Sequence, residues 1–332
     1  MEILVTGGAG FIGSNFVRYI IKKYPKARIT VLDKLTYAGN INNLRDVIKS
    51  RRIRLIKGDI CDAKTVFPLV RKSDIIVNFA AETHVDRSIV KPDEFIMTDV
   101  YGVYVLLEAA RKSKIKRFIQ ISTDEVYGEA VGKPSKETDE LKPKSPYAAS
   151  KAGGDRLVFS YYCTYNIPAV ITRCTNNYGP YQYPEKLVPL FLLNALNDMP
   201  LPVYGTGKNT RDWIYVIDHC RAIDAAMKTE GIEGETFNFG SGTELSVLDI
   251  AETILHALGK PKSLIRFVRD RPGHVLRHAV DASKALRILG WKPKMDFKDG
   301  INKTIEWYKE NEWWWRPIWR PDPMGIMRKI KR

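Results

Sequence analysis

Residues 3–13 read ILVTGGAGFIG, and the architecture of the chain follows from them. Apolar and β-branched residues lead into a G-x-x-G-x-x-G run, which is typical of a strand, a tight turn and the start of a helix. Gly7 allows the turn, Gly10 lets the backbone approach a phosphate closely, and Gly13 permits close packing of the helix. A phosphate bound there would lie at the positive end of the helix. The stretch therefore predicts a pyrophosphate cradle.

A second apolar run, residues 28–32, delivers Asp33 twenty residues after Gly13. An acid at this place hydrogen-bonds the adenosine ribose hydroxyls and repels a 2′-phosphate, which favours NAD over NADP. The alternative is an aspartate that only caps a helix.

Further strand-like runs occur at residues 54–56, 75–79, 118–121 and 169–171, with helical patterns between them. This alternation predicts an α/β fold with a Rossmann-type doubly wound parallel sheet. After Ile171 the sequence becomes polar and rich in turns, which indicates a domain border. We expect an NAD-binding domain over residues 1–176, rejoined by about 212–243. A smaller C-terminal α/β domain for the substrate would take residues 177–211 and 244–332.

Two groups of reactive side chains follow the fifth strand. Thr123, Asp124 and Glu125 come directly after it, at the sheet edge where parallel α/β folds expose their chemistry. Tyr147 and Lys151 are four residues apart after Pro146, which places both on one face of a helix. A neighbouring ammonium favours the phenolate and makes the tyrosine a usable base. Alternatively, the pair is structural and the two acids cap a helix.

Composition narrows the class of partner. The formal charge of the 332-residue chain is +15, but its Lys and Arg are scattered and no nucleic-acid motif accompanies them, so we expect an anionic small substrate and no nucleic acid. The four cysteines form no C-x-x-C pair, so neither a metal site nor a disulfide is expected. No apolar run is long enough for a membrane span, and the expected location is cytoplasmic. We interpret His84 as structural and the tryptophans of residues 307–319 as core closure rather than a binding platform.

With these residues in view, the chain resembles the extended short-chain dehydrogenase/reductase family nearly end to end. Residues 123–125, Thr-Asp-Glu, are similar to those of its nucleotide-sugar 4,6-dehydratases. The resemblance implies that Tyr147 is the base for the sugar C4 hydroxyl, with Lys151 and Thr123 assisting. It implies that Asp124 protonates the departing C6 hydroxyl and that Glu125 removes the C5 proton, which the C4 ketone has made acidic.

The resemblance also implies two sets of binding residues. Those expected to hold NAD are Gly7, Gly10, Phe11, Ile12, Gly13, Asp33, Lys34, Leu35, Thr36, Gly39, Asp59, Ile60, Ala80, Ala81, Thr83, Thr98, Tyr147, Lys151 and Asn177. Those expected to hold the substrate are Thr83, Thr123, Asn176, Lys186, Leu187, Pro202, Val203, Tyr204, Arg211, Ser246, Arg271 and His274.

The implied substrate is dTDP-glucose, converted to a 4-keto-6-deoxy sugar and water as in deoxysugar biosynthesis. Relatives usually carry an asparagine in a longer loop where Ser246 stands here, so another nucleotide sugar is an alternative. A nucleotide-sugar 4-epimerase and a non-catalytic cofactor-binding protein are the others. The family forms dimers, here through residues 94–112 and 146–165, so a homodimer is expected.

Overall fold

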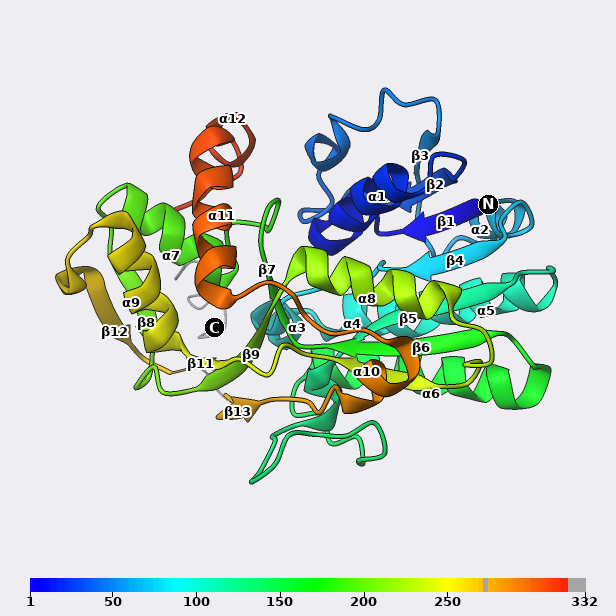
Figure 1. Ribbon diagram of the computed structural model, residues 1–332. Helices are drawn as coiled ribbons and strands as arrows, with labels where there is room; N and C mark the ends of the chain where they lie inside the picture. Colours follow the sequence, from blue (N-terminus) through cyan, green and yellow to red (C-terminus); the bar gives the residue numbers. More distant parts are fainter. Residues whose placement is uncertain (271–273, 322–332) are drawn as a thin grey trace.

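A seven-stranded parallel sheet forms the larger part of the molecule in this computed structural model, which describes residues 1–270 and 274–321 (Figure 1). Its strands are β1 (Glu2–Thr6), β2 (Arg28–Asp33), β3 (Ile53–Lys57), β4 (Ile75–Asn78), β5 (Arg117–Thr123), β6 (Ala169–Cys174) and β10 (Thr236–Phe239). They lie in the order β10-β6-β5-β4-β1-β2-β3. The order runs outward from β1 in both directions, as in a doubly wound Rossmann sheet, and the predicted fold class is confirmed.

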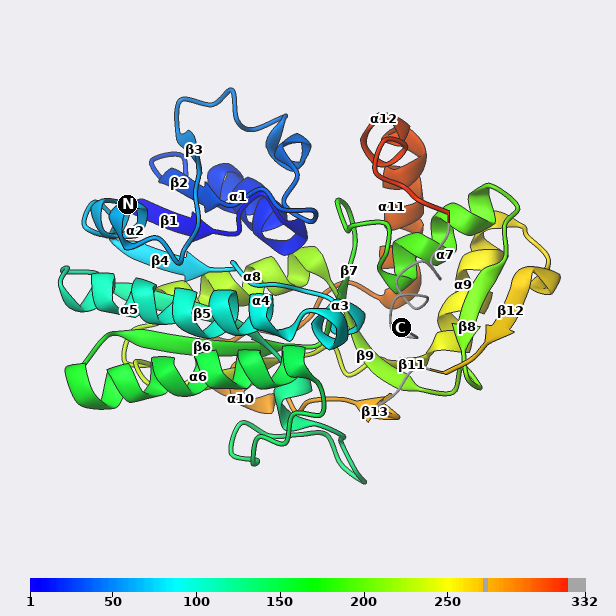
Figure 2. The same cartoon turned by 180° about the vertical axis from the view of Figure 1, so that it is seen from behind.

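Helices cover both faces of this sheet (Figures 1 and 2). One face carries α1 (Phe11–Lys23), α8 (Val216–Lys228) and α10 (Ser283–Leu289), and the other carries α2 (Ala63–Val70), α5 (Val103–Arg111) and α6 (Pro146–Tyr165). A buried apolar cluster lies under each layer, one including Phe16 and Ile223 and the other Leu106 and Phe118. Because both faces are covered, the central strands are apolar throughout.

A smaller unit packs beside the carboxyl ends of the strands (Figure 1). Its strands are β7 (Asn176–Tyr178), β8 (Leu201–Tyr204), β9 (Thr210–Tyr215), β11 (Glu244–Ser246), β12 (Ile265–Val268) and β13 (Arg277–His278). Its helices are α7 (Leu187–Leu196), α9 (Val247–Leu258), α11 (Phe297–Glu310) and α12 (Glu312–Trp315). A third apolar cluster, with Phe191, Ile254 and Tyr308, forms its core. The exact domain bounds stay a prediction, although β10 lies in the large sheet.

The segment between β4 and β5 is broken into short helices. α3 (Val85–Val90) and α4 (Pro92–Ile96) precede a π-helical turn, Met97–Gly102, that leads into α5. Short 3-10 helices occur at Ile41–Leu44, Asp124–Tyr127 and Lys262–Leu264. None of the helices within residues 1–270 and 274–321 is long and apolar enough to cross a membrane.

The sixth strand runs further than the sequence indicated. We expected it to end at Ile171 because polar residues follow, but β6 continues to Cys174. The reason is that Arg173, only 1 % exposed, is a core residue. Its guanidinium donates to Asp155 Oδ2 at 2.9 Å and to the Tyr127 hydroxyl at 2.8 Å. A buried cation is tolerated when it is paired in this way.

The C-terminal tryptophans close the core of the smaller unit, as expected, at two positions. Trp314 and Trp315 are 1 % and 5 % exposed. The Trp314 indole N–H donates to Asn43 Oδ1 at 2.6 Å, which ties α12 to the cofactor-side loop after β2. Trp313, in contrast, is 43 % exposed and does not contribute to this closure.

Candidate active site

A first cavity, of about 310 Å³, runs along the carboxyl ends of the central strands. The glycine turn forms one wall. Gly7 has a φ of 65°, and a Cβ on Gly13 would lie 2.4 Å from the Gly7 carbonyl oxygen, so neither position accepts a side chain. The helix α1 begins at Gly10, and no side chain of the described residues caps it. The N–H groups of its first turn can therefore bind an anion.

Asp33 lies at the far end of the same cavity. Its Oδ2 accepts from the Ala9 N–H and its Oδ1 from the Leu35 N–H, both at 2.8 Å. Burial raises its pKa, and these two backbone donors oppose the rise. Each oxygen retains a lone pair, so the carboxylate can still accept from the hydroxyls of a ribose. Together, the uncapped glycine turn and this acid fit a dinucleotide without a 2′-phosphate.

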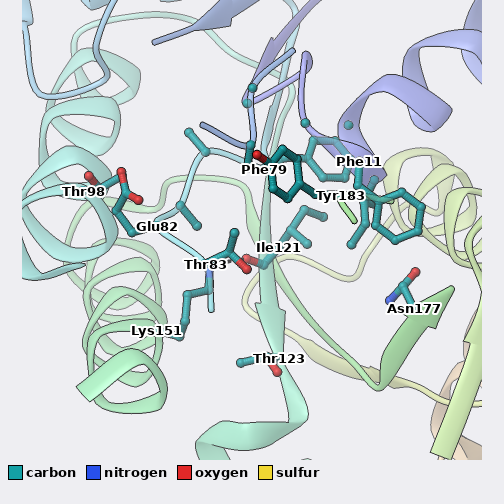
Figure 3. Close-up of a pocket in the computed structure, with 18 of the residues that line it drawn as sticks. Phe11, Phe79, Glu82, Thr83, Thr98, Ile121, Thr123, Lys151, Asn177 and Tyr183 are labelled. Atoms are coloured by element: carbon teal, nitrogen blue, oxygen red, sulfur yellow. Dashed lines mark hydrogen bonds between the residues drawn. The ribbon is translucent and has the colours of Figure 1, made fainter. Parts of the chain in front are cut away.

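The catalytic candidates of β5 lie in the middle of the cavity, where Figure 3 shows Thr123 at the strand end. The Thr123 hydroxyl donates to Asp124 Oδ1 at 3.2 Å and accepts from the Glu125 N–H at 3.3 Å. Asp124 is 4 % exposed. Its burial, and next the neighbouring Glu125 carboxylate, raise the pKa of Asp124 to about 8. At neutral pH this carboxyl group is therefore mostly protonated and able to donate.

The helix α6 brings the other two candidates to the same place. Ser145 caps it by accepting from the Ala148 N–H at 3.1 Å, and Pro146 occupies its first turn. Tyr147 and Lys151 both line the cavity from this helix, as the sequence predicted for one helix face. The Lys151 ammonium donates to the Ile121 carbonyl at 2.8 Å, which holds it at the end of β5.

The expected lowering of the tyrosine pKa is wrong for the protein by itself. Burial, and next the Glu125 carboxylate, raise the pKa of Tyr147 well above its ordinary value. The sequence drew attention to the Lys151 ammonium, but the fold adds Asp99 and Asp124 on the other side of the balance. Nearby negative charge disfavours the phenolate, so a positive charge beyond Lys151 is needed to form it.

A second cavity, of about 590 Å³, adjoins the first on the side of the smaller unit. Seven residues line both: Thr83, Glu125, Tyr147, Asn176, Tyr183, Glu185 and Lys186. Burial lowers the pKa of Lys186, whose ammonium donates to the Thr83 hydroxyl at 3.2 Å. Arg211 lines the second cavity from β9, with one guanidinium nitrogen 2.9 Å from the Val275 carbonyl oxygen. Tyr147 and Glu125 therefore stand where two ligands would meet.

The structure brings most of the predicted binding residues to these walls. All the NAD candidates except Leu35 line the first cavity. The substrate candidates that line the second are Thr83, Asn176, Lys186, Leu187, Pro202, Tyr204, Arg211 and His274, and Thr123 lines the first. Arg271 lies outside the described residues.

Three candidates are placed elsewhere than predicted. Leu35 adopts a left-handed conformation, with φ of 56°, and is not among the lining residues. Val203 is fully buried in the core of the smaller unit, because alternate residues of β8 point to opposite faces. Ser246 caps α9 through the Asp249 N–H, at 3.1 Å, and does not line the cavity.

Sequence reasoning missed several lining residues. Glu82 lines the first cavity beside Thr98 (Figure 3), and burial, then Asp99, raise its pKa to about 7. Arg87 lines the second, 2.9 Å from Glu185. Ile318 and Arg320 reach it from the C-terminal segment. Glu82 and Arg87 belong to the run of residues 80–87 that carried the resemblance, but no signal connected residues 318–320 to this site.

The fold and these cavities define a class: a Rossmann-fold enzyme with a dinucleotide cavity, an adjoining anion-lined cavity, and a tyrosine–lysine pair beside two acids. Within residues 1–270 and 274–321, no group of three or more His, Cys, Asp or Glu side chains is arranged to hold a metal ion. The profile of the family described as GDP-mannose 4,6 dehydratase matches residues 4–304. The chain belongs to this family.

Its relatives cover nearly its whole length. The chain is 49 % identical over 326 residues to a dTDP-glucose 4,6-dehydratase of Streptomyces niveus, covering 97 % of each chain. It is 51 % identical over 308 residues to the low-salt glycan biosynthesis protein Agl12 of Haloferax volcanii, covering 93 % of this chain and 98 % of that one. The crystal structure of DesIV, a dTDP-glucose 4,6-dehydratase of Streptomyces venezuelae with NAD and TYD bound, superposes with a TM-score of 0.94 at 46 % identity. That match covers 96 % of this chain and all of the other.

Proposed function

We propose that this protein converts dTDP-glucose to dTDP-4-keto-6-deoxyglucose and water, with NAD as a bound cofactor that is not consumed. The observation that carries the proposal is the position of Asp124 and Glu125 beside Tyr147 and Lys151, where the two cavities meet. The dTDP-glucose 4,6-dehydratases among its relatives, and the NAD bound in DesIV, support this choice of substrate and cofactor.

The cofactor residues account for binding and for the redox step. The uncapped first turn of α1 would hold the pyrophosphate, and Asp33 the adenosine ribose. NAD, when bound, supplies a hydride acceptor and a positive nicotinamide ring, which favours the phenolate of a nearby tyrosine. Tyr147 would take the proton of the C4 hydroxyl, and Lys151 would stabilise the phenolate.

The acid pair accounts for loss of water. A C4 ketone makes the C5 proton acidic, and Glu125, on the border between the cavities, would remove it. Asp124 would donate its proton to the departing C6 hydroxyl. Its raised pKa keeps that proton available at neutral pH. A carboxylate and a carboxylic acid side by side thus take opposite roles because their surroundings differ.

The second cavity suits the nucleotide diphosphate. Arg211, Lys186 and His274 line it and offer positive charge or N–H donors, and Tyr204 offers an aromatic surface for a base. Arg271 is proposed here from its sequence motif alone. Because Ser246 caps a helix instead of lining the cavity, selection of thymine depends on other residues than in relatives that carry an asparagine there.

An epimerase is the second candidate, because the cofactor cavity and the tyrosine–lysine pair would serve it equally. An epimerase has no use for a protonated buried acid, and Asp124 favours the dehydratase. We also propose that the chain forms homodimers. Apolar side chains more than 40 % exposed lie together on α4, α5, α6 and the turn between the first two (Figure 2), at Ile96, Met97, Tyr101, Tyr104, Phe159 and Tyr165. The cytoplasmic location stays a prediction.

Purified protein incubated with dTDP-glucose tests the proposal. We expect the mass of the nucleotide sugar to fall by one water and a 4-keto sugar to form. Tyr147→Phe, which keeps the phosphate cradle but lacks the phenolic base, should slow turnover about 10²–10⁴-fold. Formation of an isomer of unchanged mass would support the epimerase instead, and no reaction of either kind would contradict both.

A further inference from the structure

The tryptophan-rich segment after α11 is the one sequence feature that the proposed reaction does not use. Beyond closing the core, it builds a rigid turn. The Trp315 indole N–H donates to the Tyr308 carbonyl at 2.7 Å, and the Trp319 N–H donates to the Trp315 carbonyl at 2.7 Å. The rings of Trp315 and Trp319 meet edge to face, with centroids 5.6 Å apart. Residues 315–320 are thereby fixed against the smaller unit.

This turn forms part of the wall of the second cavity. Ile318 and Arg320 line it together with residues from α3, α7, β8 and β9 that are more than a hundred positions away in sequence. The Arg320 Nη1 donates to the carbonyls of Pro317, at 3.0 Å, and Trp319, at 2.9 Å. Both acceptors belong to the turn itself, so the guanidinium is held by the segment that carries it. Its Nε and Nη2 donors make no bond to any described residue, and they form the fork that binds phosphate or carboxylate oxygens.

The charge of Arg320 also differs from that of its neighbours. Arg316, four residues earlier on the same segment, forms an ion pair with Glu312. Arg87, in the same cavity wall, pairs with Glu185. For Arg320, no carboxylate among residues 1–270 and 274–321 lies within ion-pair distance. An arginine without a carboxylate partner, held in the wall of a cavity, attracts an anion into that cavity.

We propose that Arg320 binds the diphosphate of the nucleotide sugar at the mouth of the second cavity, and that Trp315 and Trp319 hold it there. The identity of the anion rests on the proposed function; the cation and its placement do not. Arg320 is exposed, so its contribution depends on ionic strength and acts largely on the rate of association. Arg211, which is buried, would act on the bound state.

Calorimetric titration with dTDP and with thymidine, at low and high salt, tests this proposal. Arg320→Gln should weaken dTDP binding about 3- to 10-fold at low salt, and less at high salt. It should leave thymidine binding unchanged, because the nucleoside lacks phosphate. In turnover assays it should raise KM for dTDP-glucose with little change in kcat. Arg320→Lys, which keeps the charge, should retain most of the dTDP affinity at low salt. Arg316→Gln is the matched control, because it removes an equal charge from the same segment but outside the cavity, and it should bind dTDP as the wild type does.

The outcomes separate the two levels of the proposal. Wild-type affinity for dTDP in Arg320→Gln, with normal turnover of the parent protein, would overturn the role of Arg320 and leave the proposed function intact. An equal loss in Arg320→Gln and Arg316→Gln would also overturn it, because it would show only a general effect of net charge. A parent protein that neither binds dTDP nor turns over dTDP-glucose would instead remove the proposed function. Thermal unfolding of each variant, followed by circular dichroism, identifies any loss of affinity that comes from loss of structure.

Discussion

At the scale of single residues, the division of labour between Asp124 and Glu125 depends on burial. The two are adjacent in sequence, yet Asp124 is enclosed at the end of β5 while Glu125 is only half-buried, between the two cavities. Desolvation penalises the charged form of the enclosed group, and the neighbouring carboxylate adds to the penalty. A proton donor and a proton acceptor can therefore stand side by side at one pH.

This difference predicts the pH dependence of elimination. Because the pKa of Asp124 is raised to about 8, the group carries its proton below that pH and loses it as the pH rises through that value. The elimination rate, measured in single turnovers, should therefore fall on the alkaline side near pH 8. Asp124→Asn should eliminate slowly at every pH and lack this alkaline limb. An unchanged limb in that variant would assign it to another group.

At the scale of elements, a buried ion pair joins α6, β6 and the turn that carries the acids. Arg173 on β6 binds Asp155 on α6 and the hydroxyl of Tyr127, which follows the acid pair. The Tyr127 hydroxyl in turn donates to Asn238 Oδ1 on β10, at 2.8 Å. The network thus fixes the helix of the tyrosine–lysine pair relative to the acid pair.

Breaking this pair should cost stability. Asp155→Ala would leave the Arg173 cation buried without its carboxylate, which should lower the free energy of unfolding by about 3–5 kcal/mol. Urea unfolding followed by circular dichroism measures the change. The control is Arg111→Ala, which breaks the more exposed Arg111–Glu108 pair, and should cost no more than about 1 kcal/mol. Equal losses in the two variants would contradict the structural role of the buried pair.

The elements themselves show what sequence can predict here. The alternating apolar runs and the glycine turn predicted the parallel sheet, because both are local signals. Arg173 misled the strand boundary, because its partner Asp155 lies on another element and only the fold brings the two together. Val203 could have been placed correctly, since its neighbours Pro202 and Tyr204 already imply that it faces away from them. Arg320 could not, because only the packing of the C-terminal turn brings it to the cavity.

At the scale of the whole molecule, the exposed apolar face of α4, α5 and α6 predicts a dimer. Packing this face against a second copy would remove six large apolar side chains from water. Sedimentation should give twice the 37.9 kDa mass of the chain. Tyr104→Glu, which places a charge within the face, should shift the equilibrium toward monomer. The exposed Trp313 lies outside this face, and Trp313→Glu should leave the mass unchanged. A monomeric parent protein would contradict the dimer.

The central claim is that one site, shared by two cavities, both oxidises C4 and eliminates water across C5 and C6. The hydrogen removed from C4 must then return to C6 of the same sugar, while C5 receives a proton from solvent. Mass spectrometry of the product made from dTDP-glucose labelled with deuterium at C4 tests this directly. The account predicts one deuterium at C6 and none at C4. Deuterium retained at C4 would indicate epimerisation, and deuterium lost to solvent would contradict transfer within the site.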